Sequence, residues 1–315
     1  MSPHPASPTP VSRRVVLGAA LAGLAAGTAG CGVTLEQDAP AIPLLPTPTR
    51  EPVPDEDQLL RAREATRRLA EAAAVVRGRD HRLAHDLAAV HRQQHRTLTA
   101  MLRRAEVPLP RSRHRQPPAH PTADRLARLE ARAVSADALD ALGRVTAASL
   151  PTLATLAAQR ASAAALLGAT PDWRGADRLP PDTAASLLKA TRPAVYALQV
   201  VAARSDRSLR RRARSTLERL QVQQRALEAF AGRAAPPPPL GYQLPEPLGS
   251  DRDLRALARD ALAPLQPAAA ALLAASAGRR AEVATLVRLL AQDTTLAAHW
   301  DVPLAPFPGL TDPAS

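Results

Sequence analysis

Long runs of helix-favouring residues, separated by clusters of proline, constrain the fold of this 315-residue chain most strongly. Hydrophobic residues make up 46% of the chain and are mostly Ala, Leu and Val, whereas aromatic residues make up only 2%. Ala and Leu favour helices, while strands favour β-branched and aromatic residues. The sequence therefore predicts an all-α fold, and its length suits about two domains.

Apolar residues recur at helical spacing along most of the chain after residue 55. The stretches end at proline clusters or at glycines such as Gly78, and Pro151 and Pro193 are expected to kink or break the helices that contain them. Expected N-terminal caps are Thr122 or Asp124, Asp182, Asp206, and Ser250 or Asp251. The expected helices cover residues 55–76, 80–104, 122–133, 135–167, 182–201, 206–230, 251–272 and 283–296.

The lengths of these helices and the long crossing connection in each half indicate four-helix bundles with a ferritin-like connection. Two such bundles in tandem are predicted, over residues 55–170 and 182–310. The stretch from Pro171 to Pro181, which contains Trp173, is the expected boundary between them.

The first 31 residues have the pattern of an export signal. Paired arginines precede a short uncharged apolar stretch, and small residues precede the only cysteine of the chain. This pattern resembles the twin-arginine export signal joined to the lipobox of bacterial lipoproteins, whose cysteine is acylated. The residues that carry the resemblance are Ser12, Arg13, Arg14, Leu17 and Cys31.

Residues 1–31 are therefore predicted to be a twin-arginine lipoprotein signal. The exported chain would be anchored to the outer face of the cytoplasmic membrane through Cys31, and no cysteine would remain for a disulfide or a metal–sulfur site. The alternative is an ordinary signal peptide with a chance cysteine. Residues 32–54 contain six prolines and are predicted to form a disordered tether.

The net charge of +12 comes almost entirely from arginine. A nucleic acid or an anionic surface is one interpretation, and the composition bias of a GC-rich genome is the other. Nucleic acid is disfavoured, because the basic runs contain no aromatic residues on which bases stack. The run from Arg204 to Arg214 either pairs with phosphates of lipid headgroups or wall polymers, or is a solvated helix start.

The second half resembles a known family through an ordered set of motifs. These are residues 194–197 (Ala-Val-Tyr-Ala), the Arg-rich stretch 211–224, residues 241–245 (Gly-Tyr-Gln-Leu-Pro), Gly278-Arg279-Arg280, Trp300, and residues 307–310 (Phe-Pro-Gly-Leu). The set is similar to a ferritin-like domain of unknown function in twin-arginine-exported lipoproteins of high-GC Gram-positive bacteria. The resemblance implies a helical bundle and no iron chemistry.

Iron chemistry is also disfavoured by the residues themselves. A di-iron bundle needs Glu-x-x-His pairs on two helices, and no glutamate of this chain has a histidine three residues later. The resemblance places an acidic or histidine residue just before residue 194, and this chain has Thr191, Arg192 and Pro193 there.

Four histidines on one expected helix are the best metal candidates. His81, His85, His91 and His95 fall within an arc of roughly 120° at about 100° per residue. They either bind Zn or Cu, or form the polar flank of an amphipathic helix. His91 is expected to border the core, while His81 and His85 face water.

The sequence predicts no catalytic residue and no cofactor. A cryptic enzyme would need buried paired carboxylates, for which the suppliers are Glu130, Asp140, Glu218, Glu228 and Glu282. The favoured function is a non-enzymatic helical scaffold or binding module of the cell envelope. Its partner would be the membrane, through the lipid anchor, and another envelope protein or an anionic wall polymer. The alternative is a metal-binding (Zn, Cu or Fe) lipoprotein that uses the histidine face.

Overall fold

The computed structural model describes residues 50–110 and 122–311 apart from residue 246. The described secondary structure is entirely helical, which confirms the predicted all-α class. Residues from Glu51 onward form one compact unit. The expected signal and almost all of the tether lie outside the described residues, including Ser12, Arg13, Arg14, Leu17 and Cys31. None of the helices in the described ranges combines the length and apolar character that a membrane span requires.

Ten α-helices and three short 3₁₀ turns make up the described secondary structure. The helices are α1 (Glu56–Ala74), α2 (His81–Arg104), α3 (Ala123–Ala131), α4 (Ala136–Leu142), α5 (Leu150–Leu166), α6 (Pro181–Arg204), α7 (Arg207–Ala231), α8 (Asp251–Leu262), α9 (Leu265–Ala270) and α10 (Arg280–His299).

Three of the expected caps are confirmed. The Thr122 side chain accepts a hydrogen bond from the Arg125 amide at 3.2 Å, Asp206 caps α7, and Ser250 forms a capping box at the start of α8. The cap expected at Asp182 is wrong. Helix α6 already begins at Pro181, so Asp182 lies in its first turn.

Two expected long helices are broken in the structure. The helix expected over residues 135–167 is divided into α4 and α5 by residues 143–149, and the break ends just before Pro151, which lies in the first turn of α5 as a helix-breaking proline can. Gly143, at the end of α4, packs against Arg280. A Cβ at residue 143 would lie 2.9 Å from the Cβ of Arg280. The helix expected over residues 251–272 is divided into α8 and α9 beside Pro264, which has no N–H to continue the ladder. Pro193, in contrast, lies inside a continuous α6.

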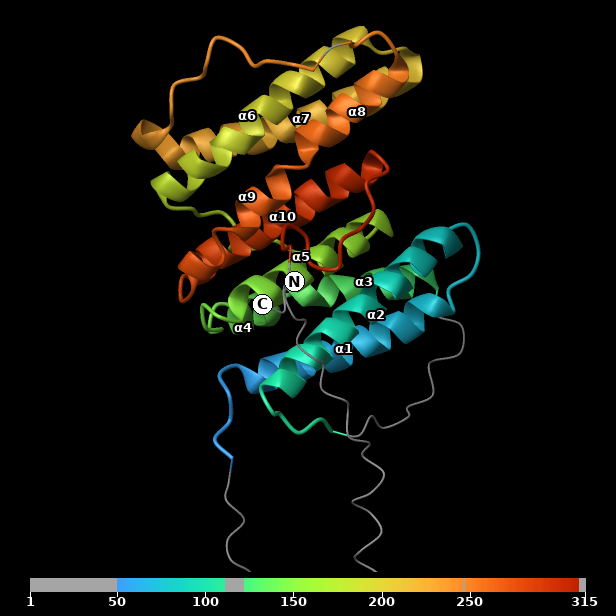
Figure 1. Cartoon of the computed structure of the whole chain (residues 1–315), viewed down its shortest axis with the longest axis vertical. Coiled ribbons are helices and arrows are strands. Elements are labelled where there is room, and N and C mark those ends of the chain that lie inside the picture. The colour runs from blue at the N-terminus through green and yellow to red at the C-terminus, as the bar shows by residue number, and fades with distance from the viewer. Residues whose placement is uncertain (1–49, 111–121, 246, 312–315) are drawn as a thin grey trace, which may run out of the picture. The chain divides into compact units, whose positions relative to one another are not determined.

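Helices α5 and α10 lie side by side at the centre of the compact unit (Figure 1). The α1–α2 hairpin and α3 cover one side of this pair, and the α6–α7 hairpin with α8 lies on the other side. Most residues of both central helices are buried, including small polar ones. A helix that is apolar around its whole circumference must be covered on all sides, which explains the central place of α5 and α10.

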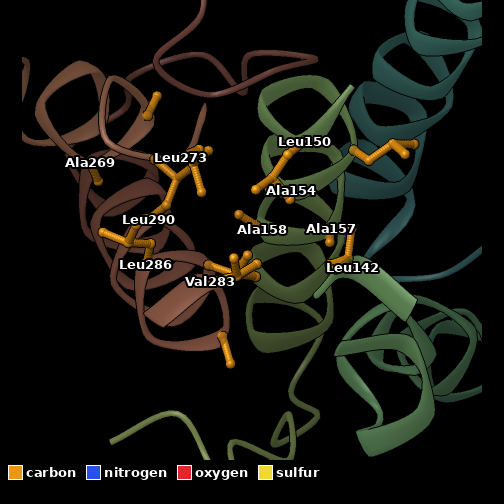
Figure 2. Close-up of a cluster of buried hydrophobic side chains, with 14 of the residues drawn as sticks. Leu142, Leu150, Ala154, Ala157, Ala158, Ala269, Leu273, Val283, Leu286 and Leu290 are labelled. Atoms are coloured by element: carbon orange, nitrogen blue, oxygen red, sulfur yellow. The ribbon is translucent and has the colours of Figure 1, made fainter. Parts of the chain in front are cut away.

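The largest hydrophobic core is built from both halves of the sequence. Figure 2 shows Leu150 and Ala154 of α5 facing Leu286 and Leu290 of α10. The two expected bundles therefore share a core, and the stretch 171–181 does not separate compact units. The reason is that α5 and α10 are each too apolar to close a bundle with a solvated outer face.

Residues that carry the family resemblance meet in space. The rings of Tyr196 and Tyr242 lie 5.5 Å apart between their centroids. The indole N–H of Trp300 donates to Thr216 of α7 at 3.0 Å, and the Trp300 carbonyl accepts from Arg259 of α8 at 2.8 Å. Trp300 therefore joins the end of α10 to α7 and α8.

Gly309 is expected to be the least replaceable of the glycines that the structure describes. Its φ is +79°, and a Cβ there would lie 2.4 Å from the Gln266 carbonyl oxygen. Gly278 is a matched control, since its φ is +78° and no atom lies within 4 Å of the added Cβ. Gly278→Ala should lower the free energy of unfolding by about 1–2 kcal/mol from backbone strain. Gly309→Ala should cost at least about twice as much, because a clash adds to the strain. Urea unfolding measures both free energies, and an equal loss of stability in the two variants would contradict this account.

Candidate functional site

A buried polar network joins α2, α3, α5 and the C-terminal segment. The side chains of His91 and Glu130 have no exposed surface, and His91 Nε2 lies 2.6 Å from Glu130 Oε1. Glu130 Oε2 accepts from Arg160 Nε at 3.4 Å. Gln94 contacts His91 Nδ1 at 2.8 Å, Gln159 at 2.9 Å and the Pro306 carbonyl at 2.7 Å. Burial lowers the pKa of Arg160, and the charge of Glu130 opposes that shift.

The Pro306 carbonyl sets the direction of these hydrogen bonds. It can only accept, so the amide nitrogen of Gln94 must face it. The Gln94 oxygen then faces His91 Nδ1, which must carry a hydrogen. One further proton lies between His91 Nε2 and Glu130, and the Arg160 guanidinium stabilises negative charge on that carboxylate.

The four candidate histidines are not brought together. His81 and His85 are exposed, as expected, with ring centroids 6.4 Å apart. His91, expected to border the core, is fully buried. His95 Nδ1 is bonded to the Arg63 carbonyl at 3.1 Å. Both nitrogens of His91 already have protein partners, so neither offers a lone pair to a metal. Within residues 50–110 and 122–311 apart from residue 246, no group of three or more His, Cys, Asp or Glu side chains is placed to hold a metal ion.

The five candidate carboxylates also lie apart in the structure. Glu218 is exposed, and each of the other four has its own partner. The pairs are Glu130 with His91, Asp140 with Arg280, Glu228 with Arg192, and Glu282 with Ser276 and Arg279.

A cavity of about 380 Å³ opens between α5, α7, α10 and the segment that carries Trp173. This volume lies within the range of small-molecule sites, roughly 300–1,000 Å³. Its wall is mainly apolar, with Ala161 and Ala165 from α5, Val222 and Ala226 from α7, and Leu289 and Leu296 from α10.

Two arginines stand in this apolar wall. Arg219 belongs to α7 and Arg288 to α10, and neither forms an ion pair with a carboxylate of the described chain. The Arg288 Nε atom is buried and has no hydrogen-bond partner. Burial lowers the pKa of Arg288, and the charge of Asp177 opposes this shift. The pKa of His299 is lowered first by burial and then by the charges of Arg219 and Arg212. The guanidiniums of Arg219 and Arg288 therefore place positive charge in the cavity wall.

Asp293 lies on α10 between two residues of the cavity wall, Leu289 and Leu296, at helical spacing. The residue is only 3% exposed, and burial raises the pKa of its carboxyl to about 7. A hydrogen bond from Gln223, which also lines the cavity, acts in the opposite direction. The Oδ1 atom has no partner. Asp293 is thus a carboxyl that titrates near neutrality directly beside the cavity.

Comparison with known proteins assigns this chain to no family. No protein-family model, curated protein or solved structure matches the chain. The resemblance to the ferritin-like lipoprotein domain stays a prediction.

Sequence reasoning missed Asp293, Arg219 and Arg288 as site residues. The signal for Asp293 was present, because it stands where the apolar stripe of α10 calls for a hydrophobic residue. No comparable signal marked the two arginines, because Arg219 on α7 and Arg288 on α10 come to line one cavity only in the folded structure.

Asp293 is expected to make stability fall as pH rises from about 4 to about 7. In this window the folded chain holds a proton that the unfolded chain, with an ordinary Asp pKa near 3.9, has lost. The cost at pH 8 is on the order of 4 kcal/mol. Asp293→Asn should remove this slope, match the original chain near pH 4 and exceed its stability at pH 8.

Chemical unfolding between pH 4 and 8 measures this slope. Asp260→Asn is the control, because Asp260 is exposed on α8 and the same loss of charge there should leave the slope unchanged. A slope that persists in Asp293→Asn would show that another group causes it.

Proposed function

We propose that this chain is an exported lipoprotein that acts as a non-enzymatic helical binding module of the cell envelope. Its ligand is a small amphiphilic anion, and its binding site is the cavity between α5, α7 and α10. The observation that carries the proposal is the placement of two arginines without ion-pair partners, Arg219 and Arg288, in a mainly apolar wall.

The two parts of the wall suit the two parts of such a ligand. The side chains from α5 and α10 provide a surface on which an alkyl chain loses contact with water, at about 25 cal/mol per Å² buried. The guanidiniums supply charge-assisted hydrogen bonds to a carboxylate or phosphate. A purely apolar ligand would leave Arg288 Nε without a partner, whereas an anionic headgroup would pair it.

The anchor follows from the export signal and Cys31. Two or more acyl chains hold a protein stably on a membrane, and the lipoprotein modification supplies at least two. The helical body would then stand close to the membrane surface.

Replacing Cys31 by serine should release the chain from the membrane. In the producing bacterium, the original chain should appear in the membrane fraction and incorporate an alkyne-tagged fatty acid. Cys31→Ser should lose the label and leave that fraction. Because Cys31 is the only cysteine, no other thiol can account for a label. An unlabelled original chain recovered from the medium would overturn the anchor and leave the ordinary signal peptide.

Dodecanoate should bind in the cavity and alter the fluorescence of Trp173, which lines it. The titration is performed in a Cys31→Ser background so that no acyl chain competes. The double variant Arg219→Gln/Arg288→Gln should weaken dodecanoate binding at least about tenfold, the equivalent of one charged hydrogen bond. Binding of neutral dodecanol should change much less.

Two controls fix the location of this binding. Arg207→Gln/Arg211→Gln removes the same charge from exposed positions of α7 outside the cavity wall and should leave dodecanoate binding unchanged. Ala226→Leu narrows the cavity and should weaken the binding of both ligands. Absence of saturable binding, or equal losses for the two ligands in the arginine variant, would reject the proposed ligand class.

A further inference from the structure

The arginines of α7 face in three directions. Arg210 donates to the Ser205 carbonyl at 2.6 Å, and Arg212 pairs with Asp301 at 3.4 Å while its guanidinium lies 5.7 Å from the ring centroid of Trp300. These two arginines hold α7 to its neighbours. Arg219 faces the cavity.

Four further arginines form a stripe on the exposed side of α7. Arg207, Arg211, Arg214 and Arg225 fall within an arc of about 60°, at 100° per residue. All four are exposed, and none has a hydrogen-bond or ion-pair partner among the residues that the structure describes. Glu218 is the one acidic residue within the arc, so the stripe carries an excess of positive charge. We call these four residues the basic stripe.

An exposed apolar side chain borders the basic stripe. Val222 is 58% exposed, and it is one of three large hydrophobic residues that are exposed in the described part of the chain. It lies between the basic stripe and the cavity-facing side of α7, and it also lines the cavity. Positive charge beside an exposed aliphatic group is the combination that favours the headgroup region of an anionic bilayer.

We infer that the basic stripe docks α7 on an anionic lipid surface. Each arginine near such a surface contributes about 1 kcal/mol, so the net contribution of the stripe is modest. It is sufficient to orient a body that is already held at the membrane, because tethering raises the effective concentration of the surface. This last step rests on the proposed anchor at Cys31, from which the roughly 25 residues to the start of α1 could reach at most about 90 Å.

Docking by the basic stripe would bring the cavity to the lipid. The cavity wall of α7 adjoins the stripe along the helix, with Val222 at the border. An amphiphilic anion from the membrane would then reach the cavity along Val222, with its headgroup close to Arg219.

The test is flotation of the full-length Cys31→Ser chain with vesicles of phosphatidylglycerol and phosphatidylcholine at low salt. The charge-reversed variant Arg207→Glu/Arg211→Glu/Arg214→Glu should lose at least about tenfold in vesicle partitioning. Glutamates in the first turns of α7 suit the positive end of the helix dipole, so the variant is expected to fold, which circular dichroism checks.

A matched control separates the stripe from overall charge. Arg82→Glu/Arg92→Glu/Arg103→Glu makes the same change in net charge at exposed positions of α2 and should retain most of the binding. Equal losses in the two triple variants would overturn the inference, because only the net charge would matter.

A second arm separates lipid from wall polymer. Val222→Gln should weaken binding to vesicles and leave binding to soluble polyphosphate unchanged. Stripe-dependent binding to polyphosphate without binding to vesicles would overturn the inference in favour of an anionic polymer. Neither arm uses the cavity ligand, so these results stay separate from the dodecanoate titration.

Discussion

The contact between α5 and α10 is the constraint on which the rest of the described structure depends. Leucines such as Leu150, Leu286 and Leu290 are fully buried in it, and each contributes about 1.5–3 kcal/mol relative to an exposed side chain. The side chains of Ala154 and Ala158 are small and protrude little from α5, so the two helices can approach closely. Because both helices are also buried on their other sides, each outer hairpin is needed to cover them, and the halves of the chain cannot separate without exposing this core.

Burial of polar groups beside this core has two different outcomes. In the network of His91, Glu130 and Gln94, each named side chain has a partner, and the bonds cross from α2 to α3, α5 and the C-terminal segment. A buried ion pair adds little net stability over apolar residues, but breaking one is costly, so its effect is to fix one arrangement. Asp293 has a hydrogen bond from Gln223 but no partner for its Oδ1 atom, and burial raises the pKa of its carboxyl to about 7. The network therefore fixes how the helices pack, whereas the protonation of Asp293 beside the cavity changes with pH.

Local signals predicted the hairpins well. Gly78 and Asp80 mark the turn between α1 and α2, and Asp206 marks the start of α7, because turns and caps depend on nearby residues. Pro151 predicted a kink or break in the stretch that forms α4 and α5, and α5 indeed begins at Leu150. The end of α4 at Leu142 could not be predicted in this way, because Gly143 contacts Arg280, which is far along the chain. Glu130 and Asp293 are polar residues at positions where helical spacing favours apolar ones. The sequence does not show which side chains pack against them, so it could not predict their hydrogen-bond partners. His91 was correctly placed at the core, although its partner on α3 could not be inferred from the spacing of histidines on one helix.

The arginine-rich sequence of α7 shows why charge composition alone could not define a site. Helix α7 packs mainly against α6, so much of its circumference is left to the cavity and to solvent. Long arginine stems lie along apolar surface while their guanidiniums reach a partner or water, so one residue type serves several environments. The guanidinium of Arg212 lies over the Trp300 ring, Arg219 lies in the cavity wall, and Arg211 is exposed to solvent. The sequence shows only a run of positive charge. The register of α7 against α10 decides which of these arginines can meet a ligand and which can meet a surface.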